Sequence, residues 1–218
     1  MSSYPLRREL CRVSLSLYQR GYVHATAGNV SVQVEGGTLI TPTDACLGHL
    51  DPAQLAFVDD AGVQQSGDRA SKTLALHRAI YAAAPAARCV IHSHSTHLVA
   101  LSLAGVWRDD AVLPPITPYC VMKVGRVPLV AYRRPGDPAV AEQVAGLIGA
   151  AQARGAPIRA VLLERLGPVV WHETPAAAMA VLEELEETAR LWLMTVPKPA
   201  PLTDEQLAEL REQFGARW

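Results

Sequence analysis

The sequence has few aromatic residues and almost no net charge, and the lack of net charge argues against general nucleic-acid binding. Aromatic residues make up 6% of the 218 residues, and 20 Lys and Arg residues are balanced by 21 Asp and Glu residues, for a formal net charge of −1 at pH 7. General nucleic-acid binders usually carry a basic excess, so this balance argues against a nucleic-acid partner. It is still compatible with a local basic patch that binds a small anion.

Long apolar runs and paired cysteines are also missing. No apolar run reaches the roughly 18 to 20 residues that cross a membrane, and the first eight residues contain no apolar stretch typical of a signal peptide. The cysteines stand far apart, without a C-x-x-C pair, at Cys11, Cys46, Cys89 and Cys120. We therefore expect reduced thiols in a cytoplasmic protein that has no membrane partner.

The sequence contains no Walker A loop, no G-x-G-x-x-G after a strand and no G-x-S-x-G nucleophile elbow. Hydrophobic residues make up 50%, which is enough for a core, and the length suits one main domain. We expect this domain over residues 1–196, followed by a linker and a short helix over residues 197–218. Thr203 and Gln206 have the spacing of a capping box for that helix.

Apolar segments with strand patterns alternate with amphipathic segments, which indicates an α/β chain. Strands are expected over residues 29–34, 38–41, 89–92, 127–132, 158–163 and 169–171. Helices are expected over residues 6–19, 96–103 and 138–150, and two more should follow the N-cap candidates Ser71 and Thr174. The acidic residues 183–187 lie mostly opposite the apolar stripe of the last long helix, which favours a solvated face over a metal site.

Three of the seven histidines lie within His92-Ser93-His94-Ser95-Thr96-His97. Alternate side chains of a strand point to one face, so His92 and His94 should lie side by side. Two imidazoles on one face can bind one zinc ion if other groups complete the site. Histidines that hydrogen-bond in the core are the alternative, but the end of an apolar strand favours metal binding.

Polar residues at a helix start and in two loops are candidates for binding an anion. Ser71 and Lys72 could hold a phosphate through a hydroxyl, backbone N–H groups and the helix dipole, or could belong to an ordinary helix cap. The loops 26–29 and 41–43 suit an anion, although most such loops are only turns.

Taken together, these segments resemble the class II aldolase/adducin family, in the right order over about residues 5–195. The matching segments are Ala27-Gly28-Asn29-Val30-Ser31, Leu39-Ile40-Thr41-Pro42-Thr43, Ser71-Lys72 with His77, His92-Ser93-His94 with His97, and Gly167-Pro168-Val169-Val170. Within the family, the chain is most similar to the 3-oxo-tetronate 4-phosphate decarboxylases. That similarity rests on residues 46–52, 117–119, 132–137 and 183–189.

The resemblance implies a three-layer α/β/α sandwich with a mainly antiparallel central sheet. It also implies a homotetramer with active sites between subunits, a divalent metal, usually zinc, and a small sugar or sugar-acid phosphate as substrate. His92 and His94 match metal ligands, and phosphate-binding positions are matched by Asn29, Thr43 and Ser71. Lys72 adds a cation there, and Tyr119 lies near a family tyrosine that reaches a neighbouring site. Lys72 and Tyr119 are therefore the candidate catalytic residues.

Three positions depart from the family pattern. Thr73 stands where many members have Glu or Asp, Leu166 stands where the third metal histidine is expected, and Asp44 replaces a glycine. The residues that could substitute for the missing ligands are His97, His172, Glu164 and Glu173.

A β-keto acid that loses CO2 needs an electron sink and a proton donor, but no base that removes a C–H proton. Thr73 therefore weighs less against a decarboxylase than against an aldolase. We expect a metal-dependent lyase that converts a 3-oxo-tetronate 4-phosphate to dihydroxyacetone phosphate through an enediolate. One alternative is a catalytically silent binding module, because Thr73 and Leu166 replace two of the usual metal-site residues. Another is an aldolase for a different substrate, because Asp44 would repel a phosphate.

Overall fold

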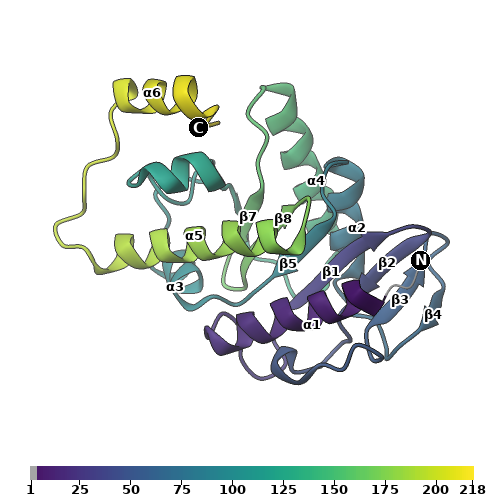
Figure 1. Ribbon diagram of the computed structural model, residues 1–218. Coiled ribbons are helices and arrows are strands. Elements are labelled where there is room, and N and C mark those ends of the chain that lie inside the picture. The colour runs from purple at the N-terminus through teal and green to yellow at the C-terminus, as the bar shows by residue number, and fades with distance from the viewer. Residues whose placement is uncertain (1–3) are drawn as a thin grey trace.

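The computed structural model describes residues 4–218 and contains one eight-stranded sheet in the order β4-β3-β2-β1-β5-β8-β7-β6 (Figure 1). The strands are β1 (Asn29–Val34), β2 (Gly37–Ile40), β3 (Ala56–Asp59), β4 (Gln64–Ser66), β5 (Cys89–His92), β6 (Leu129–Val130), β7 (Ala160–Leu163) and β8 (Gly167–His172). All neighbours pair antiparallel except β6 and β7, which are parallel. This arrangement confirms the expected mainly antiparallel sheet.

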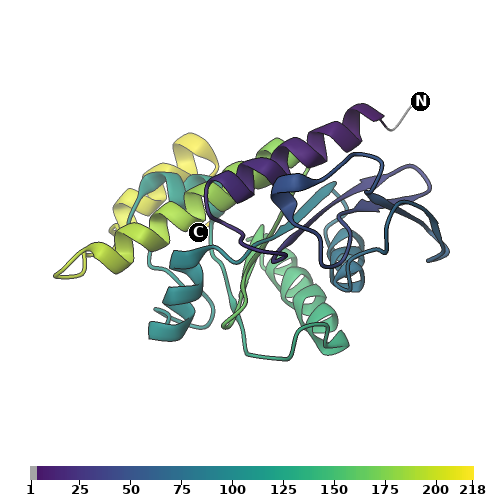
Figure 2. The ribbon, with the colours of Figure 1, turned by 90° about the horizontal axis from the view of Figure 1, so that it is seen from below.

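Helices cover both faces of the sheet, as the view from below shows (Figure 2). One face packs against α1 (Tyr4–Gln19), α3 (Thr96–Ala104), α5 (Pro175–Met194) and the π-helical turn η2 (Cys120–Val124). The other face packs against α2 (Leu74–Ala83) and α4 (Pro138–Ala153). The expected three-layer sandwich is therefore confirmed.

The period-two pattern of the strands produces the two cores. On β5, Cys89 and Ile91 enter the core beneath α1, α3 and α5, whereas Val90 enters the core beneath α2 and α4. These three side chains are fully buried. A central strand buried on both faces reads as a continuous apolar run, which explains why Cys89-Val90-Ile91 shows no polar alternation.

Capping residues determine where several helices begin. The Thr174 hydroxyl accepts a hydrogen bond from the Ala177 N–H at the start of α5, and Asp137 does the same for Ala139 in α4. The expected capping box of Thr203 and Gln206 is present at α6 (Asp204–Phe214). The expected cap at Ser71 is wrong, because α2 begins at Leu74 and Thr73 is its N-cap residue.

The last helix, α6, follows residues 197–203, which form neither helix nor strand. It packs against η2 through a small apolar cluster that contains Leu207, Ala216 and Val121. The division into a domain over residues 1–196 and a tail over residues 197–218 stays a prediction.

Two further expectations concern the ends of the chain and its thiols. Residues 1–3, part of the segment used to argue against a signal peptide, lie outside the described residues. Across residues 4–218, no helix has the length and apolar character needed to cross a membrane. All four cysteines are free, as expected.

Candidate functional site

A cavity of about 410 Å³ lies where β5 ends and where α2 and α4 begin. Six of the predicted site residues line it: Asn29, Thr43, Ser71, Lys72, His92 and His94. Tyr119 does not line it, and its side chain is 60% exposed at the start of η2. The structure thus brings together the predicted metal and phosphate residues and leaves Tyr119 apart.

The sheet topology explains this convergence. Asn29 begins β1 and pairs directly with His92 at the end of β5. Residues 70–71 pair with residues 41–42 beyond the end of β2, and this brings Ser71 beside the Thr43 loop. Sequence segments about 30 and 60 residues apart therefore meet at one end of the sheet.

His92 is a buried, neutral imidazole with one nitrogen already fixed. Its Nδ1 donates a hydrogen bond to the Pro168 carbonyl oxygen at 3.0 Å, which leaves Nε2 as the unprotonated nitrogen. The pKa of His92 is lowered to about 4, mainly by burial and also by the nearby His94, while the hydrogen bond to the Pro168 carbonyl acts in the opposite direction. At neutral pH, His92 can therefore offer a lone pair to a ligand or metal.

His94 lies beside His92, with ring centroids 5.0 Å apart. The ring of His24, which the sequence analysis did not single out, meets His94 edge-on at a centroid distance of 6.1 Å. Burial lowers the pKa of His94, and the neighbouring His24 adds to this effect. His94 is therefore also neutral at pH 7.

The two imidazoles fit two positions of a divalent-metal site. A metal-binding histidine commonly donates its other N–H to a backbone carbonyl, as His92 does to Pro168. Thr73 and Leu166 cannot supply the usual remaining ligands, because the Thr73 hydroxyl bonds Ser71 at 2.9 Å and Leu166 is apolar. Across residues 4–218, no three His, Cys, Asp or Glu side chains come together in a way that could hold a metal ion.

None of the four candidate substitute ligands lines the cavity. His97 Nδ1 lies 2.8 Å from a Glu186 carboxylate oxygen, and Glu164 accepts a hydrogen bond from the Tyr132 N–H. His172 Nδ1 accepts a hydrogen bond from the N–H of Glu173. Each of these side chains, apart from that of Glu173, is thus engaged outside the cavity.

The predicted anion-binding wall of the cavity, formed by residues 43–44 and 71–72, contains an acidic residue as well as a cation. Lys72 Nζ lies 4.0 Å from Asp44 Oδ2, and both side chains are mostly exposed. Asp44 has a φ of 56°, a conformation that glycine adopts without strain and that Asp tolerates better than most residues. This backbone conformation would also suit the glycine that the resemblance implies at this position.

Asn29 presents an unpartnered polar atom at the cavity. Its side chain is only 6% exposed, and its Oδ1 has no hydrogen-bond partner in the structure. Buried polar atoms normally have a partner, so this amide is available to a bound ligand.

Arg134 also lines the cavity, although it was not among the predicted site residues. It belongs to the loop Arg134–Asp137 before α4, and the N–H of Asp137 donates to the Arg134 carbonyl. The Arg-Pro-Gly-Asp sequence indicates a tight turn before a helix. The sequence contains no signal that this turn faces the loops 41–43 and 71–73 across the cavity.

A buried polar chain lies behind His92. His77 Nδ1 and the Tyr81 hydroxyl are each 2.7 Å from the Ser31 hydroxyl. His77 is fully buried, its Nε2 has no partner, and burial together with the nearby His92 lowers its pKa to about 3. These residues connect α2 to β1 beneath the cavity.

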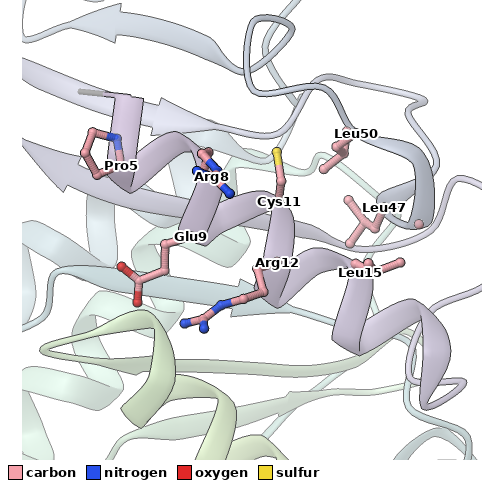
Figure 3. A pocket seen from close by; sticks show the side chains of 9 residues that line it. Pro5, Arg8, Glu9, Cys11, Arg12, Leu15, Leu47 and Leu50 are labelled. Carbon is pink, nitrogen blue, oxygen red and sulfur yellow. The ribbon is translucent and has the colours of Figure 1, made fainter. Parts of the chain in front are cut away.

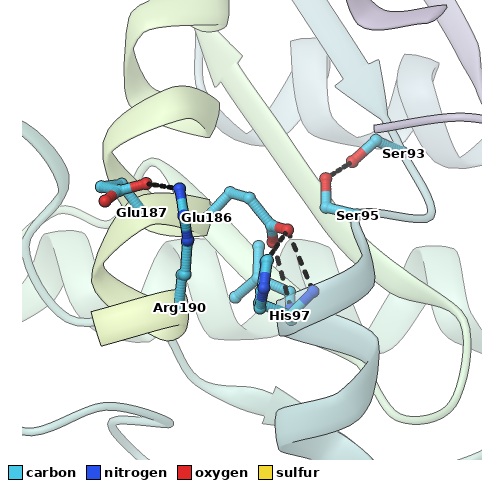
Figure 4. Close-up of polar contacts among 7 residues, drawn as sticks. Ser93, Ser95, His97, Glu186, Glu187 and Arg190 are labelled. Atoms are coloured by element: carbon cyan, nitrogen blue, oxygen red, sulfur yellow. Dashed lines mark hydrogen bonds and ion pairs between the residues drawn. The ribbon is translucent and has the colours of Figure 1, made fainter. Parts of the chain in front are cut away.

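Glu186 corrects the interpretation of the acidic run on α5. Its side chain is buried, and its two carboxylate oxygens accept hydrogen bonds from the N–H groups of His97 and Leu98 at the start of α3 (Figure 4). Glu187 conforms to the expected solvated face and pairs with Arg190. Glu186 thus fixes the helix that follows the His92–His94 turn.

A second, larger hollow of about 640 Å³ lies between α1 and the 3₁₀ turn η1 (Leu47–His49) (Figure 3). Its lining includes Arg8, Glu9, Arg12 and Cys11 and none of the predicted site residues. Burial raises the pKa of the Cys11 thiol, and Asp51 raises it further, so the nucleophilic thiolate is disfavoured. This hollow therefore offers no activated thiol.

Comparison with known proteins shows the family to which the chain belongs. The family model described as "Class II Aldolase and Adducin N-terminal domain" matches residues 8–193. A 3-oxo-tetronate 4-phosphate decarboxylase from Cupriavidus necator is 59% identical and covers 98% of this chain and 97% of its own. An L-fuculose phosphate aldolase from Escherichia coli K12 is 30% identical and covers 98% of this chain and 96% of its own.

Solved structures agree with the fold. YgbL from Escherichia coli superposes with a TM-score of 0.87 at 42% identity and covers 96% of this chain and 99% of its own. An L-fuculose 1-phosphate aldolase superposes with a TM-score of 0.80 at 22% identity and covers 99% of this chain and 98% of its own, a likeness of fold alone.

The α/β/α fold and these relatives, which are decarboxylases and aldolases, define a carbon–carbon lyase. The chain belongs to the class II aldolase/adducin family. Class II aldolases are metal-dependent enzymes.

Proposed function

We propose that this lyase decarboxylates 3-oxo-tetronate 4-phosphate to dihydroxyacetone phosphate. The supporting observation is a single cavity that joins two neutral imidazoles to a cation, two hydroxyls and a buried amide. This set of groups suits a small phosphorylated oxo acid. The 59% identical relative carries the name of this activity.

The bond changes of the reaction define what the cavity must do. The C1–C2 bond breaks and CO2 leaves, while the bonding electron pair moves toward the C3 carbonyl and gives an enediolate. A proton then reaches C2 and forms dihydroxyacetone phosphate. No C–H proton has to be removed, so Thr73 at the position of the family's carboxylate is compatible with the reaction.

We assign His92 and His94 as the side chains that hold a divalent metal, which by the resemblance is zinc. When bound, the metal would supply the electron sink for the carbonyl oxygen. With only two protein ligands, its affinity should be low unless substrate or water completes the coordination.

Lys72, Ser71, Thr43 and Asn29 would bind the phosphate. Lys72 offsets part of the negative charge of the phosphate and of Asp44, whose carboxylate lies 4.0 Å away. Because Lys72 would contact the substrate, it is also our candidate catalytic residue on this wall.

We further propose a homotetramer in which Tyr119 contributes to the site of a neighbouring subunit. Two observations support this assignment: Tyr119 is 60% exposed, and it does not line the cavity of its own chain. The resemblance supplies the role of the tyrosine. A cytoplasmic location remains a prediction.

The direct test is steady-state release of CO2 and dihydroxyacetone phosphate from 3-oxo-tetronate 4-phosphate, with and without added zinc. We expect turnover by the wild type and a rise in KM of roughly tenfold or more for Lys72→Ala, from loss of a charged hydrogen bond. Lys198→Ala is the matched control, because Lys198 contacts the Trp192 carbonyl far from the cavity lining. Absence of turnover by metal-loaded wild type would refute the proposal.

A further inference from the structure

Arg134 is a second fixed cation of the cavity, and the proposed phosphate site does not use it. The cavity lining contains Lys72 on the anion-binding wall and Arg134 in the loop before α4. A 3-oxo-tetronate 4-phosphate also has two anionic ends, a phosphate and a carboxylate. The question is therefore whether the two cations are placed to bind the phosphate and the carboxylate of one substrate molecule.

Sheet order places the two cations on opposite sides of the histidine pair. Lys72 belongs to the segment that pairs beside the end of β2, and β2 lies two strands from β5 in the sheet. Arg134 follows β6, which lies three strands from β5 in the other direction. His92 ends β5, between these two positions.

The backbone that carries Arg134 is fixed by its own turn. The Asp137 N–H donates to the Arg134 carbonyl at 3.1 Å, and Gly136 has a φ of 79°, which a residue with a Cβ rarely adopts. Asp137 in turn caps α4 by accepting a hydrogen bond from Ala139. The Arg134 side chain thus extends from a rigid anchor.

The two carboxylates that line the cavity, and Glu164, which does not line it, are each close to a cation other than Arg134. Asp44 lies 4.0 Å from Lys72, Asp137 lies 4.0 Å from Arg133, and Glu164 lies 3.9 Å from Arg165. Across residues 4–218, the hydrogen bonds and ion pairs of the structure do not include the Arg134 guanidinium. Arg134 is therefore available to an anion that enters the cavity.

We propose that Arg134 binds the carboxylate of the substrate and makes the enzyme select 3-oxo acids. This inference rests on the proposed function. The phosphate would lie toward Lys72, the C2 and C3 oxygens near His92 and His94, and the carboxylate toward Arg134. A guanidinium matches a carboxylate with two parallel hydrogen bonds, which a lysine ammonium cannot reproduce.

This contact should act on binding more than on the chemical step. The carboxylate carries its full charge in the bound substrate and loses it as neutral CO2 forms, so the guanidinium does not favour the transition state over the ground state. Removal of Arg134 should therefore raise KM without lowering kcat.

The test compares two unreactive ligands by titration calorimetry on the full chain. A tetronate 4-phosphate, which has a hydroxyl in place of the ketone, carries both charges, whereas dihydroxyacetone phosphate carries only the phosphate. For Arg134→Ala we expect affinity for the tetronate phosphate to fall roughly ten- to hundredfold, with affinity for dihydroxyacetone phosphate unchanged. Arg134→Lys should lose less affinity for the tetronate phosphate than Arg134→Ala does. Arg133→Ala is the control, and it should bind both ligands as the wild type does.

The outcomes separate this inference from the proposed function. An equal loss for both ligands would assign Arg134 to the phosphate, and no loss for either would remove it from the site, so both results refute the inference. Wild type that binds neither ligand would refute the substrate class as well. If wild type binds both ligands and Arg134→Ala loses affinity only for the tetronate phosphate, but wild type releases no CO2, the carboxylate site is supported and the decarboxylase activity is refuted. Arg134→Gln repeats the test if the alanine variant does not fold.

Discussion

His77 is a buried histidine that remains uncharged at the cost of stability in acid. Its pKa falls to about 3 because burial disfavours the imidazolium, and the ordinary value is 6.5. Between these two values the unfolded chain binds a proton at this position and the folded chain does not. By linkage, the free energy of unfolding must therefore decrease as the pH falls through this range.

We predict that His77→Gln removes this part of the acid sensitivity. Relative to the variant, wild type should lose about 1.4 kcal/mol of stability per pH unit once the pH is below 6.5, down to about pH 3. Urea unfolding at pH 7, 6, 5 and 4 measures the difference.

The control for this experiment is Ser31→Ala, which removes the hydrogen bond to His77 without removing the titrating ring. The stability difference between this variant and wild type should change much less with pH. A difference between His77→Gln and wild type that stays constant from pH 7 to pH 4 would contradict the assigned pKa.

At the residue scale, the sequence was informative where chemistry and spacing coincide. His92 and His94 follow from the H-x-H spacing on a strand, and the cavity contains both. Arg134 and His24 could not be found in this way, because their positions depend on which loops the sheet order brings together. A surface arginine and a loop histidine have no local pattern that distinguishes them.

At the scale of elements, Glu186 joins two helices that are remote in sequence. Its carboxylate accepts the N–H groups of His97 and Leu98, which have no partner within α3, and it adds a negative charge at the positive end of the helix dipole. α3 begins two residues after His94, so Glu186 also orients the turn between β5 and α3.

We predict that Glu186→Gln lowers the free energy of unfolding by about 1 to 3 kcal/mol, because a charge-assisted cap is lost in a buried setting. Glu187→Gln, one residue along the same helix, removes only an exposed ion pair with Arg190 and should change stability by less than about 0.5 kcal/mol. Urea unfolding at pH 7 compares the two. Equal midpoints for both variants would show that Glu186 does not act as a cap.

Most elements were predictable because their signals are local. The apolar periodicity, Thr174 with Pro175 and the capping box at Thr203 led to α1, α5 and α6. The strands β3 and β4 were not predicted. β4 has no apolar pattern, because it consists of Gln64-Gln65-Ser66; it is exposed and is a strand only through its pairing with β3. Likewise, β6 is shorter than expected, because only Leu129 and Val130 pair with β7.

On the scale of the whole molecule, the proposed tetramer connects Tyr119 to chemistry in another chain. We predict that Tyr119→Phe and His92→Ala, each impaired as a pure protein, recover activity when the two are denatured together and reassembled. Mixed tetramers contain sites with a native His92 from one chain and a native Tyr119 from its neighbour. Decarboxylase assays before and after mixing measure the recovery.

Analytical ultracentrifugation of the same samples checks the assembly. Sedimentation as a monomer would remove the basis for any exchange of residues between chains. Mixed tetramers whose activity equals the average of the parents would place Tyr119 in the site of its own chain.

The sheet order also has a consequence for how the protein is made on the ribosome. β5 lies between β1, which is synthesised well before it, and β8, which emerges about 75 residues later. Until residue 172 has left the exit tunnel, the strand that ends in His92 has an open edge, and the carbonyl of Pro168 is not yet available to orient the ring. During this interval the nascent chain thus presents an incomplete candidate site with an unpaired strand edge, and a chaperone that shields strand edges would act at this stage.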